Sequence, residues 1–406
     1  MLYEIGIFFY DIMVHLAALF SRKVRKLVKG QWEVYKLLRL QVKKEACYIW
    51  FHAASLGEFE QGRPLMEEIR IRHPEYKILL TFFSPSGYEV RKSYRGVDIV
   101  SYLPFDKIRN VKKFLGIVHP CMAFFIKYEF WKNYLEELNK RRIPVYSVSS
   151  IFRKEQIFFK WYGSIFRKML KNFDYLFVQN EISKNYLAQL EINRVTVVGD
   201  TRFDRVLEIK QKSKELFLVE AFKGNAFTLI AGSSWTPDED MVIEYFNKHP
   251  EMKLILAPHI VDESHLIAII NKLKRPYTCY THADEKSVQK ADCLIIDCYG
   301  LLSSIYRYGE VAYIGGGFEV GIHNTLEAAV YGIPVLFGPK YQKFMEAVSL
   351  IEKGGAYSVN NYDELQALLD QLFFDEQFLK ETGRKAGDYV MANSGATNKI
   401  LGMINF

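Results

Sequence analysis

Short, wholly apolar runs alternate with amphipathic stretches along most of the chain. The first series of runs consists of CYIWFHA (47–53), YKILLTFF (76–83), MAFFIK (122–127), PVYSVSS (144–150) and YLFVQ (175–179). Runs of this length that are apolar on both faces are typical of buried parallel strands, and the amphipathic stretches between them are typical of crossover helices. The pattern therefore predicts a doubly wound α/β domain.

A polar segment interrupts the alternation after residue 200. RVLEIKQKSKELFLVEAFKGN (205–225) has no strand pattern. The alternation restarts with FTLIAGSS (227–234), KLILAP (253–258), DCLIID (292–297), VAYIGG (311–316) and PVLFG (334–338). Two such series predict two doubly wound domains, residues 31–205 and 206–406. Ligands of this architecture bind at the carboxyl ends of the strands, so the chemistry is expected directly after the apolar runs.

The N-terminal segment, LYEIGIFFYDIMVHLAALF (2–20), is long enough to cross a bilayer. It contains Glu4, Asp11 and His15, which share one helical face, and a carboxylate near mid-span costs roughly 2.5–3.5 kcal/mol. Gathered polar residues favour a helix that lies in the membrane interface, while a true span and a core helix stay open as alternatives. A signal peptide fits poorly, because the positive charge follows the apolar run.

Composition and charge narrow the partner class. The content is 49% hydrophobic, which is typical of a globular protein, and the net charge is only +7. Much of that charge follows the apolar N-terminus, at Arg22, Lys23, Arg25, Lys26 and Lys29. This placement favours an anionic membrane surface over nucleic acid and predicts a membrane element over residues 1–30. The five cysteines show no C-x-x-C spacing, which argues against a disulfide framework or a structural zinc site.

The stretch FHAASLGEFEQGRPL (51–65) places a strand end, a small-residue turn and a helix start in succession. Ser55 and Glu58 have the spacing of a capping box, which is a purely structural role. Alternatively, Glu58 projects from the strand end as a general base, held ionised by the helix macrodipole. The residues by themselves leave both interpretations open.

Two further turns of the first domain carry candidate ligand groups. In TFFSPSGYE (81–89), Ser86 and its neighbours suit an anion, although an ordinary strand-to-helix turn looks the same. In FIKYEFWKN (125–133), Lys127 could pair with a carboxylate or phosphate and Glu129 could bind hydroxyls. If the strand continues through them, the two side chains share a face, and a plain Lys–Glu ion pair is the alternative.

The second domain opens with AGSSWTPDED (231–240), where Ser233 and Ser234 lie in a turn before a helix with an acidic first turn. A well-capped helix and a phosphate-binding turn are both compatible with this pattern. His259 follows the next strand, where it could contact a base or a phosphate.

The segment VAYIGGGFEVGIHNTLEAAVYGIPVLFGPKYQKF (311–344) carries the most specific pattern. A glycine triplet, Gly315, Gly316 and Gly317, follows a strand and allows close approach of a phosphate. Asn324 and Thr325 are predicted to begin a helix whose N-terminus binds an anion, with Glu327 placed for ribose hydroxyls. The spacing does not match the G-x-G-x-x-G fingerprint of dinucleotide sites.

Segments in order along the chain resemble the Kdo (3-deoxy-D-manno-octulosonic acid) transferases of lipopolysaccharide biosynthesis. The similar segments are WFHAASLGEFEQGRPL, TFFSPSGYE, YLPFD, KYEFW, FVQNE, GDTRFD, AGSSW, LAPH and GGGFEVGIHNTLEAAVYGIPVLFGP with YQKF. The resemblance covers residues 47 to about 350 and implies a GT-B fold, in which two Rossmann-like domains face each other across a cleft. It also implies an N-terminal membrane-associated helix and a C-terminal helix that can cross back to the first domain.

The resemblance implies roles for particular residues. Glu58 would be the base that deprotonates the acceptor hydroxyl, with Lys127 and Glu129 also in the active site. Substrate-binding candidates, with Arg202 expected near the interdomain cleft, are Ser55, Ser86, Arg202, Ser233, Ser234, His259, Gly315, Gly316, Gly317, His323, Asn324 and Glu327. The implied partners are CMP-Kdo, a lipid A precursor and the anionic cytoplasmic face of the inner membrane, without nucleic acid.

These residues predict an inverting transfer without a metal or other cofactor. Loss of CMP leaves an oxocarbenium-like sugar, so the enzyme must neutralise a phosphate and accept one proton. No D-x-D motif lies in a plausible loop, since the nearest acidic cluster, Asp238–Asp240, begins a predicted helix. The alternatives are a UDP-sugar transferase, a UDP-sugar epimerase or a non-catalytic, membrane-bound lipid-binding scaffold.

Overall fold

A computed structural model describes residues 2–406, which divide into two compact units. The first unit extends to Arg205 and includes residues 394–406, and the second comprises Val206–Asn393. Each unit contains a seven-stranded, fully parallel sheet within the described residues. The fold is therefore α/β with two Rossmann-like domains.

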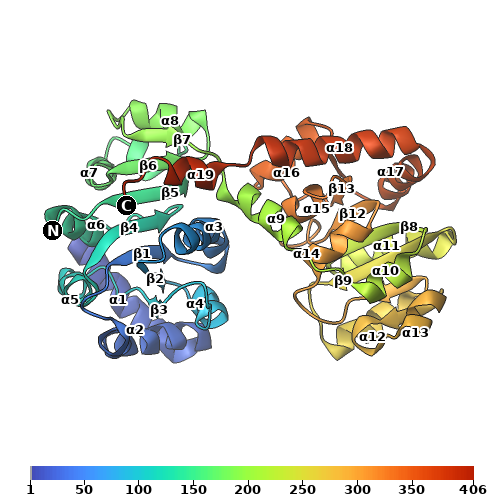
Figure 1. The fold of residues 1–406 in the computed structure, drawn as a ribbon, viewed down its shortest axis with the longest axis horizontal. Helices are drawn as coiled ribbons and strands as arrows, with labels where there is room; N and C mark the ends of the chain where they lie inside the picture. The colour runs from blue at the N-terminus through green and yellow to red at the C-terminus, as the bar shows by residue number, and fades with distance from the viewer. Residues whose placement is uncertain (1) are drawn as a thin grey trace. The chain divides into compact units, whose positions relative to one another are not determined.

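The first sheet is built from the first series of apolar runs. Across the sheet its strands are β3 (Ile99–Tyr102), β2 (Lys77–Phe82), β1 (Tyr48–Ala53), β4 (Pro120–Ile126), β5 (Val145–Ser150), β6 (Tyr175–Val178) and β7 (Val195–Val197). The helices after the N-terminal pair are α3 (Leu56–Arg72), α4 (Pro85–Arg91), α5 (Ile108–Val118), α6 (Lys132–Lys140), η1 (Ile157–Phe159), α7 (Ser164–Leu170), α8 (Glu181–Ala188), α9 (Thr201–Gln211, which continues into the second unit) and α19 (Ala396–Leu401) (Figure 1). The strand order reverses once, between β1 and β4.

The second sheet repeats this arrangement. Its strands are, in order, β10 (Tyr277–Cys279), β11 (Cys293–Ile295), β9 (Met252–Pro258), β8 (Phe227–Ser234), β12 (Val311–Ile314), β13 (Val335–Phe337) and β14 (Ala356–Ser358). The helices are α10 (Phe217–Lys223), α11 (Thr236–Lys248), α12 (Glu263–Lys272), η2 (Tyr280–His282), α13 (Glu285–Lys290), α14 (Leu302–Ile305), η3 (Tyr306–Tyr308), α15 (Leu326–Ala329), α16 (Met345–Glu352), α17 (Tyr362–Phe374) and α18 (Glu376–Ala392). Here the order reverses between β8 and β12.

Every predicted apolar run forms a strand, and the polar connector forms α9 and α10 without a strand. The strands that were not predicted, β3, β7, β10 and β14, are the outermost strands of the two sheets. Each has only three or four residues, with sequences such as VTV and YTC. An edge strand has one neighbour instead of two, so a short, partly polar sequence suffices and leaves a weak signal.

Side-chain alternation along each strand supplies both faces of the first sheet. On β1, Trp50 packs into one core with its indole 5.0 Å from the ring of Phe114 and 5.4 Å from that of Tyr134. The neighbouring Ile49 and Phe51 pack into the opposite core, which α3 and α19 cover. Each fully buried large side chain contributes about 1.5–3 kcal/mol, so the two cores hold β1 and β4 rigidly under the site.

The chain end belongs to the first unit. The backbone N–H groups of Gly395 and Thr397 donate to the Asp204 carboxylate, the latter at 2.7 Å. Ile400 is buried in the core beside α3, and the ring of Phe406 stacks on His73 with centroids 4.0 Å apart. Residues 394–406 thus return to the first unit, beside α3 (Figure 1), while α18 lies in the second.

The N-terminal segment forms two helices, α1 (Leu2–Phe20) and α2 (Arg22–Gln41), which meet at the N-cap residue Ser21. The basic residues after the apolar segment are therefore the first turns of α2, which runs through residue 30 without a break. The helix continues through Gly30 because the apolar positions keep their helical spacing. A Cβ on Gly30 would lie 2.2 Å from the Tyr102 ring, so glycine lets α2 approach the end of β3.

One side of α1 packs on the first unit. The Tyr3 hydroxyl donates to Asp106 at 2.6 Å, Asp11 forms an ion pair with Lys107, and Val14 is buried. The predicted polar side is thus used partly for contacts within the protein. Apolar side chains cover much of the remaining surface, with Ile5, Phe8, Phe9, Ile12, Met13, Leu16, Leu19 and Phe20 exposed. The window Tyr3–Phe20 is long and apolar enough to cross a membrane, and only 6% of it is buried.

We expect Asp106 to make the first unit less stable as the pH rises. Burial raises the pKa of this fully buried carboxyl to about 7, although Tyr3 and the N–H groups of Asn133 and Tyr134 favour the charge. An unfolded aspartate ionises near its ordinary value of 3.8, so the free energy of unfolding should fall between about pH 4 and pH 7. Asp106→Asn should remove roughly 2–3 kcal/mol of the difference between about pH 5 and pH 7.5, measured by urea unfolding. Equal pH slopes for both proteins would contradict this assignment.

Candidate active site

The first group of candidate residues lies at the carboxyl ends of β1 and β4, where the strand order reverses. Glu58 is in the first turn of α3, and its Oε2 accepts hydrogen bonds from the N–H groups of Ala54 at 2.6 Å and Ser55 at 3.1 Å. Ser55 and Glu58 thus form the capping box predicted from their spacing, with the Glu58 carboxylate accepting from the Ser55 N–H. Glu58 therefore stabilises the turn with one oxygen, and its Oε1 has no hydrogen bond among the described residues.

The environment of Glu58 raises its pKa. Burial is the largest cause, followed by the neighbouring Glu129 carboxylate, while His52 and the two N–H groups act in the opposite direction. We expected the helix N-terminus to hold this carboxylate in its charged form. The N–H groups do favour the charge, but burial and a second carboxylate outweigh them. A base with a raised pKa binds a proton more strongly while still being ionised at higher pH.

Glu129 is held by two side chains that the sequence analysis did not single out. Its Oε2 lies 3.0 Å from Nε2 of the fully buried His52 and accepts a bond from Nε1 of Trp131 at 2.7 Å. The other ring nitrogen of His52 lies 2.9 Å from Oγ1 of Thr81 on β2. A buried histidine needs hydrogen-bond partners for both ring nitrogens. The position of His52 inside the apolar run of β1 was therefore the signal in the sequence that this residue has polar partners.

Lys127 adopts a left-handed backbone conformation with φ of +65°. The extended geometry assumed for Lys127 and Glu129 is therefore wrong, and no ion pair between them occurs among the described residues. The Lys127 ammonium instead lies 5.4 Å from the ring centroid of Tyr128. A non-glycine residue in this region costs on the order of 1–3 kcal/mol, and such strain is common at functional sites.

Tyr128 brings further groups into the same region. Its hydroxyl is buried and has no hydrogen-bond partner among the described residues. Burial raises its pKa, and the charges of Arg153, Glu58 and Asp200 act on it as well. The hydroxyl therefore stays protonated at neutral pH and is available as a donor.

Arg202 forms an ion pair with Asp200, whose carboxylate accepts from Nε at 2.9 Å and from a terminal nitrogen at 2.8 Å. Gln61 of α3 donates to the same carboxylate at 3.2 Å, so Arg202 is connected to the helix that carries Glu58. Ser86, in contrast, is exposed, and its N–H and hydroxyl are both bonded to the hydroxyl of Ser84. Among the described residues, no hydrogen bond connects Ser86 to Glu58.

The second group lies in the other unit, at the ends of β8 and β12. Asp238 connects the two ends: Oδ2 accepts from the N–H groups of Trp235 at 3.0 Å and Gly316 at 2.8 Å, and Oδ1 accepts from the Tyr313 hydroxyl at 2.9 Å. The acidic first turn of α11 thus caps its own helix, which was one of the two interpretations of this sequence, and also fixes the glycine loop. Because the Gly316 N–H is bonded to Asp238, it is not free for a ligand.

The glycine triplet is explained by backbone packing. A Cβ on Gly315 would lie 2.3 Å from the Ser233 carbonyl oxygen, and one on Gly317 would lie 2.5 Å from Cα of Gly338. Gly316 has a φ of +92°, which favours glycine. These contacts bring the ends of β8, β12 and β13 together, which is a structural reason for all three glycines.

Ser233 and Ser234 differ in their exposure and in their hydrogen bonds. The hydroxyl of Ser234 donates to the fully buried Glu239 at 3.1 Å, and His265 lies 2.9 Å from the same carboxylate oxygen. Ser233 has a φ of +53° and is partly exposed. Both serines are the last residues of β8 and do not form the predicted turn, so this strained position, like Lys127, lies at a strand end.

Three aromatic side chains stack beside this turn. Trp235 stacks on His259 with ring centroids 4.9 Å apart, and His259 lies 4.4 Å from His323. Trp235 Nε1 also donates to Nε2 of His323 at 3.2 Å. Burial, and then the nearby His259, lowers the pKa of His323 to about 4, so this ring is neutral at physiological pH. Sequence reasoning missed Trp235, although it follows the singled-out serines directly.

Asn324 and Glu327 are paired, with Nδ2 of Asn324 donating to Glu327 at 3.0 Å. Asn324 Oδ1 also accepts from the Leu326 N–H at 3.2 Å. The predicted helix is only the four-residue α15. Gly332, with its positive φ, and Pro334, which lacks a backbone N–H, prevent it from continuing. A single turn carries little macrodipole, so the expected anion binding by a long helix is not available. The buried Thr325 hydroxyl has no partner among the described residues.

No group of three or more His, Cys, Asp or Glu side chains within residues 2–406 is arranged to hold a metal ion.

Several known proteins with similar sequences carry the same activity name. Residues 29–205 match the family described as 3-deoxy-D-manno-octulosonic-acid transferase (kdotransferase). The chain is 28% identical to the 3-deoxy-D-manno-octulosonic acid transferase of Aquifex aeolicus, over 82% of this chain and 88% of that protein. It is 24% identical to the enzyme of the same name from Haemophilus influenzae, over 88% and 86% of the two chains.

The fold is shared with a solved nucleotide-sugar enzyme. UDP-GlcNAc 2-epimerase from Neisseria meningitidis, bound to UDP-GlcNAc, has a TM-score of 0.63 and covers 87% of this chain and 98% of its own. The sequence identity is 16%, so the likeness concerns the architecture of two Rossmann-like domains and not the reaction.

We expect the Asp238 hydrogen bonds to be essential for the stability of the second unit. In Asp238→Asn the amide nitrogen cannot accept a bond, so at least one of three buried donors loses its partner, at a cost of about 1–3 kcal/mol. Thermal unfolding should show this loss. The matched control is Asp240→Asn, which removes an exposed ion pair with Lys272 and should cost at most about 1 kcal/mol. Similar losses for both variants would disprove the linking role.

Proposed function

We propose that this chain, as a member of the Kdo transferase family, transfers Kdo from CMP-Kdo to a lipid A precursor. Residues 29–205, which match the family, contain Glu58 in the S-x-G-E turn and Lys127 and Glu129 in KYEFW. The observation that supports the proposal most directly is the environment of Glu58. This carboxylate is positioned by two N–H groups at a strand end and has a raised pKa, as a general base requires.

In the proposed reaction, Glu58 accepts the proton of the acceptor hydroxyl as that oxygen attacks the anomeric carbon of Kdo. The bond between this carbon and the phosphate oxygen of CMP breaks, and CMP leaves with the bonding electrons. Attack from the side opposite the phosphate inverts the anomeric centre. General-base assistance of this kind is usually worth about 10²–10⁴-fold in rate.

Donor binding is proposed for the second unit. Ser233, His259, Asn324 and Glu327 lie beside the ends of β8 and β12, together with the glycine loop. Ser234 and Gly316 shape this surface from within, since their polar hydrogens are already bonded. The buried hydroxyl of Thr325 provides an additional donor for a ligand.

Attachment to the cytoplasmic face of the inner membrane is part of the proposal. Asp11 pairs with Lys107 and Tyr3 bonds to Asp106, which holds one side of α1 on the protein. The exposed apolar side then inserts into one leaflet, with the basic residues of α2 close to anionic headgroups. This arrangement favours a helix that lies in the interface over one that spans the bilayer.

The first test is a transfer assay with the full chain, CMP-Kdo generated in place and a dispersed lipid A precursor. We expect a mass gain of whole Kdo units, CMP release and unchanged activity in EDTA, because the proposed chemistry uses only side chains and N–H groups. Glu58→Gln should lower turnover by at least about 10²-fold while donor binding persists. The glutamine oxygen can still accept from Ala54 and Ser55, so the turn is retained.

The matched control is Glu68→Gln, on the same helix but in a surface ion pair with Arg72, which should keep full turnover. Undiminished turnover of Glu58→Gln would refute its role as the base. Activity with a UDP-sugar and none with CMP-Kdo would support one of the alternative enzymes. Lipid binding without transfer of any sugar would support a scaffold.

A second prediction concerns the pH profile. Because the Glu129 carboxylate raises the pKa of Glu58, Glu129→Gln should lower that pKa. The acidic limb of kcat/KM, where the base becomes protonated, should therefore move to lower pH in this variant. A limb that stays in place, or moves to higher pH, would contradict the coupling between the two carboxylates. The comparison uses the shape of the profile and does not depend on the activity that the variant retains.

A further inference from the structure

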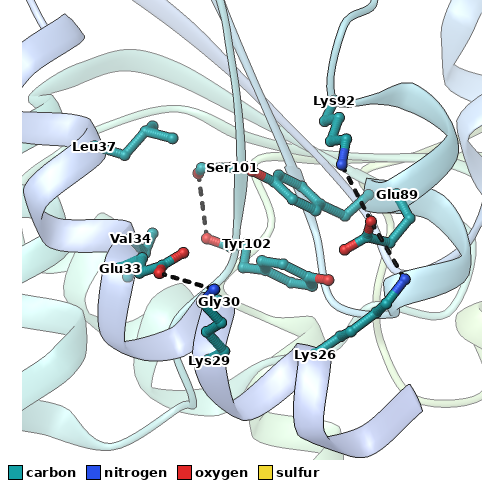
Figure 2. A pocket seen from close by; sticks show the side chains of 11 residues that line it. Lys26, Lys29, Gly30, Glu33, Val34, Leu37, Glu89, Lys92, Ser101 and Tyr102 are labelled. Atoms are coloured by element: carbon teal, nitrogen blue, oxygen red, sulfur yellow. Dashed lines mark hydrogen bonds and ion pairs between the residues drawn. The ribbon is translucent and has the colours of Figure 1, made fainter. Parts of the chain in front are cut away.

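The first unit contains a pocket of about 330 Å³ whose lining includes none of the candidate active-site residues. Helix α2 forms one wall, α4 another, and the end of β3 forms the floor (Figure 2). Its lining residues are Lys26, Lys29, Gly30, Glu33, Val34, Leu37, Tyr88, Glu89, Lys92, Ser101 and Tyr102. The reaction proposed above uses none of them.

Two ammonium groups converge at the mouth of the pocket. Nζ of Lys26 lies 3.6 Å and Nζ of Lys92 lies 3.2 Å from the same oxygen of Glu89 (Figure 2). Each ammonium has three N–H donors and Glu89 engages one, so both lysines, which are about half exposed, keep donors for a second anion. Lys29 and Glu33 form another pair at 3.8 Å. The lining therefore has three cationic and two anionic side chains, and a surplus of positive charge.

The floor provides a neutral donor. Tyr102 is 3% exposed, and its ring packs in a tilted arrangement against Tyr88 at a centroid distance of 4.1 Å. Its buried hydroxyl has no hydrogen-bond partner among the described residues. An unpaired buried hydroxyl costs about 1–3 kcal/mol, a cost that a ligand oxygen would remove. Burial raises the pKa of Tyr102, so the hydroxyl keeps its proton.

The pocket adjoins α1, and the inference drawn here rests on the membrane attachment proposed above for that helix. Tyr102 and Tyr88 belong to the same apolar cluster as Val14 and Ala18 of α1, whose other side is exposed and apolar. Val34 and Leu37 add an apolar wall to the pocket. A ligand that carries both a phosphate and an apolar part fits this combination.

We propose that the pocket between α2, α4 and β3 binds the phosphate group of an anionic membrane lipid. Lys26 and Lys92 donate to the phosphate oxygens, and the Tyr102 hydroxyl donates from below. Val34 and Leu37 contact the apolar part that follows the headgroup. The pocket thereby adds a specific lipid contact to the non-specific insertion of α1.

The test measures flotation of the full chain with vesicles of phosphatidylcholine, with or without phosphatidylglycerol. The quantity of interest is the preference, that is, the ratio of the two affinities. Tyr102→Phe leaves the charge unchanged and removes a hydroxyl without a protein partner, so the variant should fold normally. It should reduce the preference about tenfold, as expected for a hydrogen bond to a charged group, without changing binding to phosphatidylcholine.

The lysines are tested against a charge-matched pair. Lys26→Ala/Lys92→Ala should reduce the preference by about tenfold more than Lys23→Ala/Lys36→Ala, which removes two exposed lysines of α2 outside the pocket. Equal losses for the two pairs, together with an unaffected Tyr102→Phe, would overturn the proposal. So would displacement of the protein from vesicles by millimolar glycerol phosphate or inorganic phosphate, since the site would then be one for soluble phosphate. The assay contains neither CMP-Kdo nor a lipid A precursor, so its failure would leave the proposed transferase reaction untouched.

Discussion

In each unit the strand order of a fully parallel sheet reverses once, between β1 and β4 in the first and between β8 and β12 in the second. Successive crossover helices cover opposite faces at such a point, so the ends of these two strands are left open. The residues with candidate chemistry are concentrated there: Glu58 and Glu129 in one unit, and Ser233 and the glycine loop in the other. Because β1 and β4 are buried on both faces, these groups stand on rigid supports.

The same apolar strands make buried polar groups expensive, which explains how the sites are organised. His52 and Asp238 are almost fully buried, and each is satisfied by hydrogen bonds to groups from other elements. The partners of these residues, Glu129 and Gly316, are thereby fixed in position. At Glu58 the balance differs, because desolvation and a second carboxylate exceed the stabilisation from two N–H groups. The raised pKa makes Glu58 a stronger base, and its ionised form is correspondingly less stable than that of an exposed glutamate.

Helix α1 at the N-terminus has two sides of different character. One side of α1 is tied to the first unit through Tyr3 and Asp11, and the other side is broadly apolar. The contacts with Asp106 and Lys107 hold that side of α1 on the first unit. Helix α2 continues directly from Ser21, so its basic residues have defined positions beside β3 and α4. The charge of these basic residues and the shape of the pocket beside them can therefore both contribute to ligand binding at this end of the first unit.

The sequence by itself determined which segments are buried strands, because long apolar runs have no stable place other than between two layers of helices. It also placed Glu58, Lys127 and the glycine triplet after those strands and Ser233 near the end of one, since strand ends follow from the order of residues. The short edge strands escaped because a strand with one neighbour needs little apolar sequence.

Only the tertiary structure decided the chemistry of each group, because pKa values and hydrogen bonds depend on residues that are distant in the chain. His52 meets Glu129 across 77 positions, and Gly316 meets Asp238 across 78. The left-handed backbone of Lys127 likewise follows from the packing around β4 and β5 and not from its own residue type. Local sequence predicts at which strand end or turn a residue lies. The charge state and the hydrogen-bond partners of its side chain are set by the folded environment.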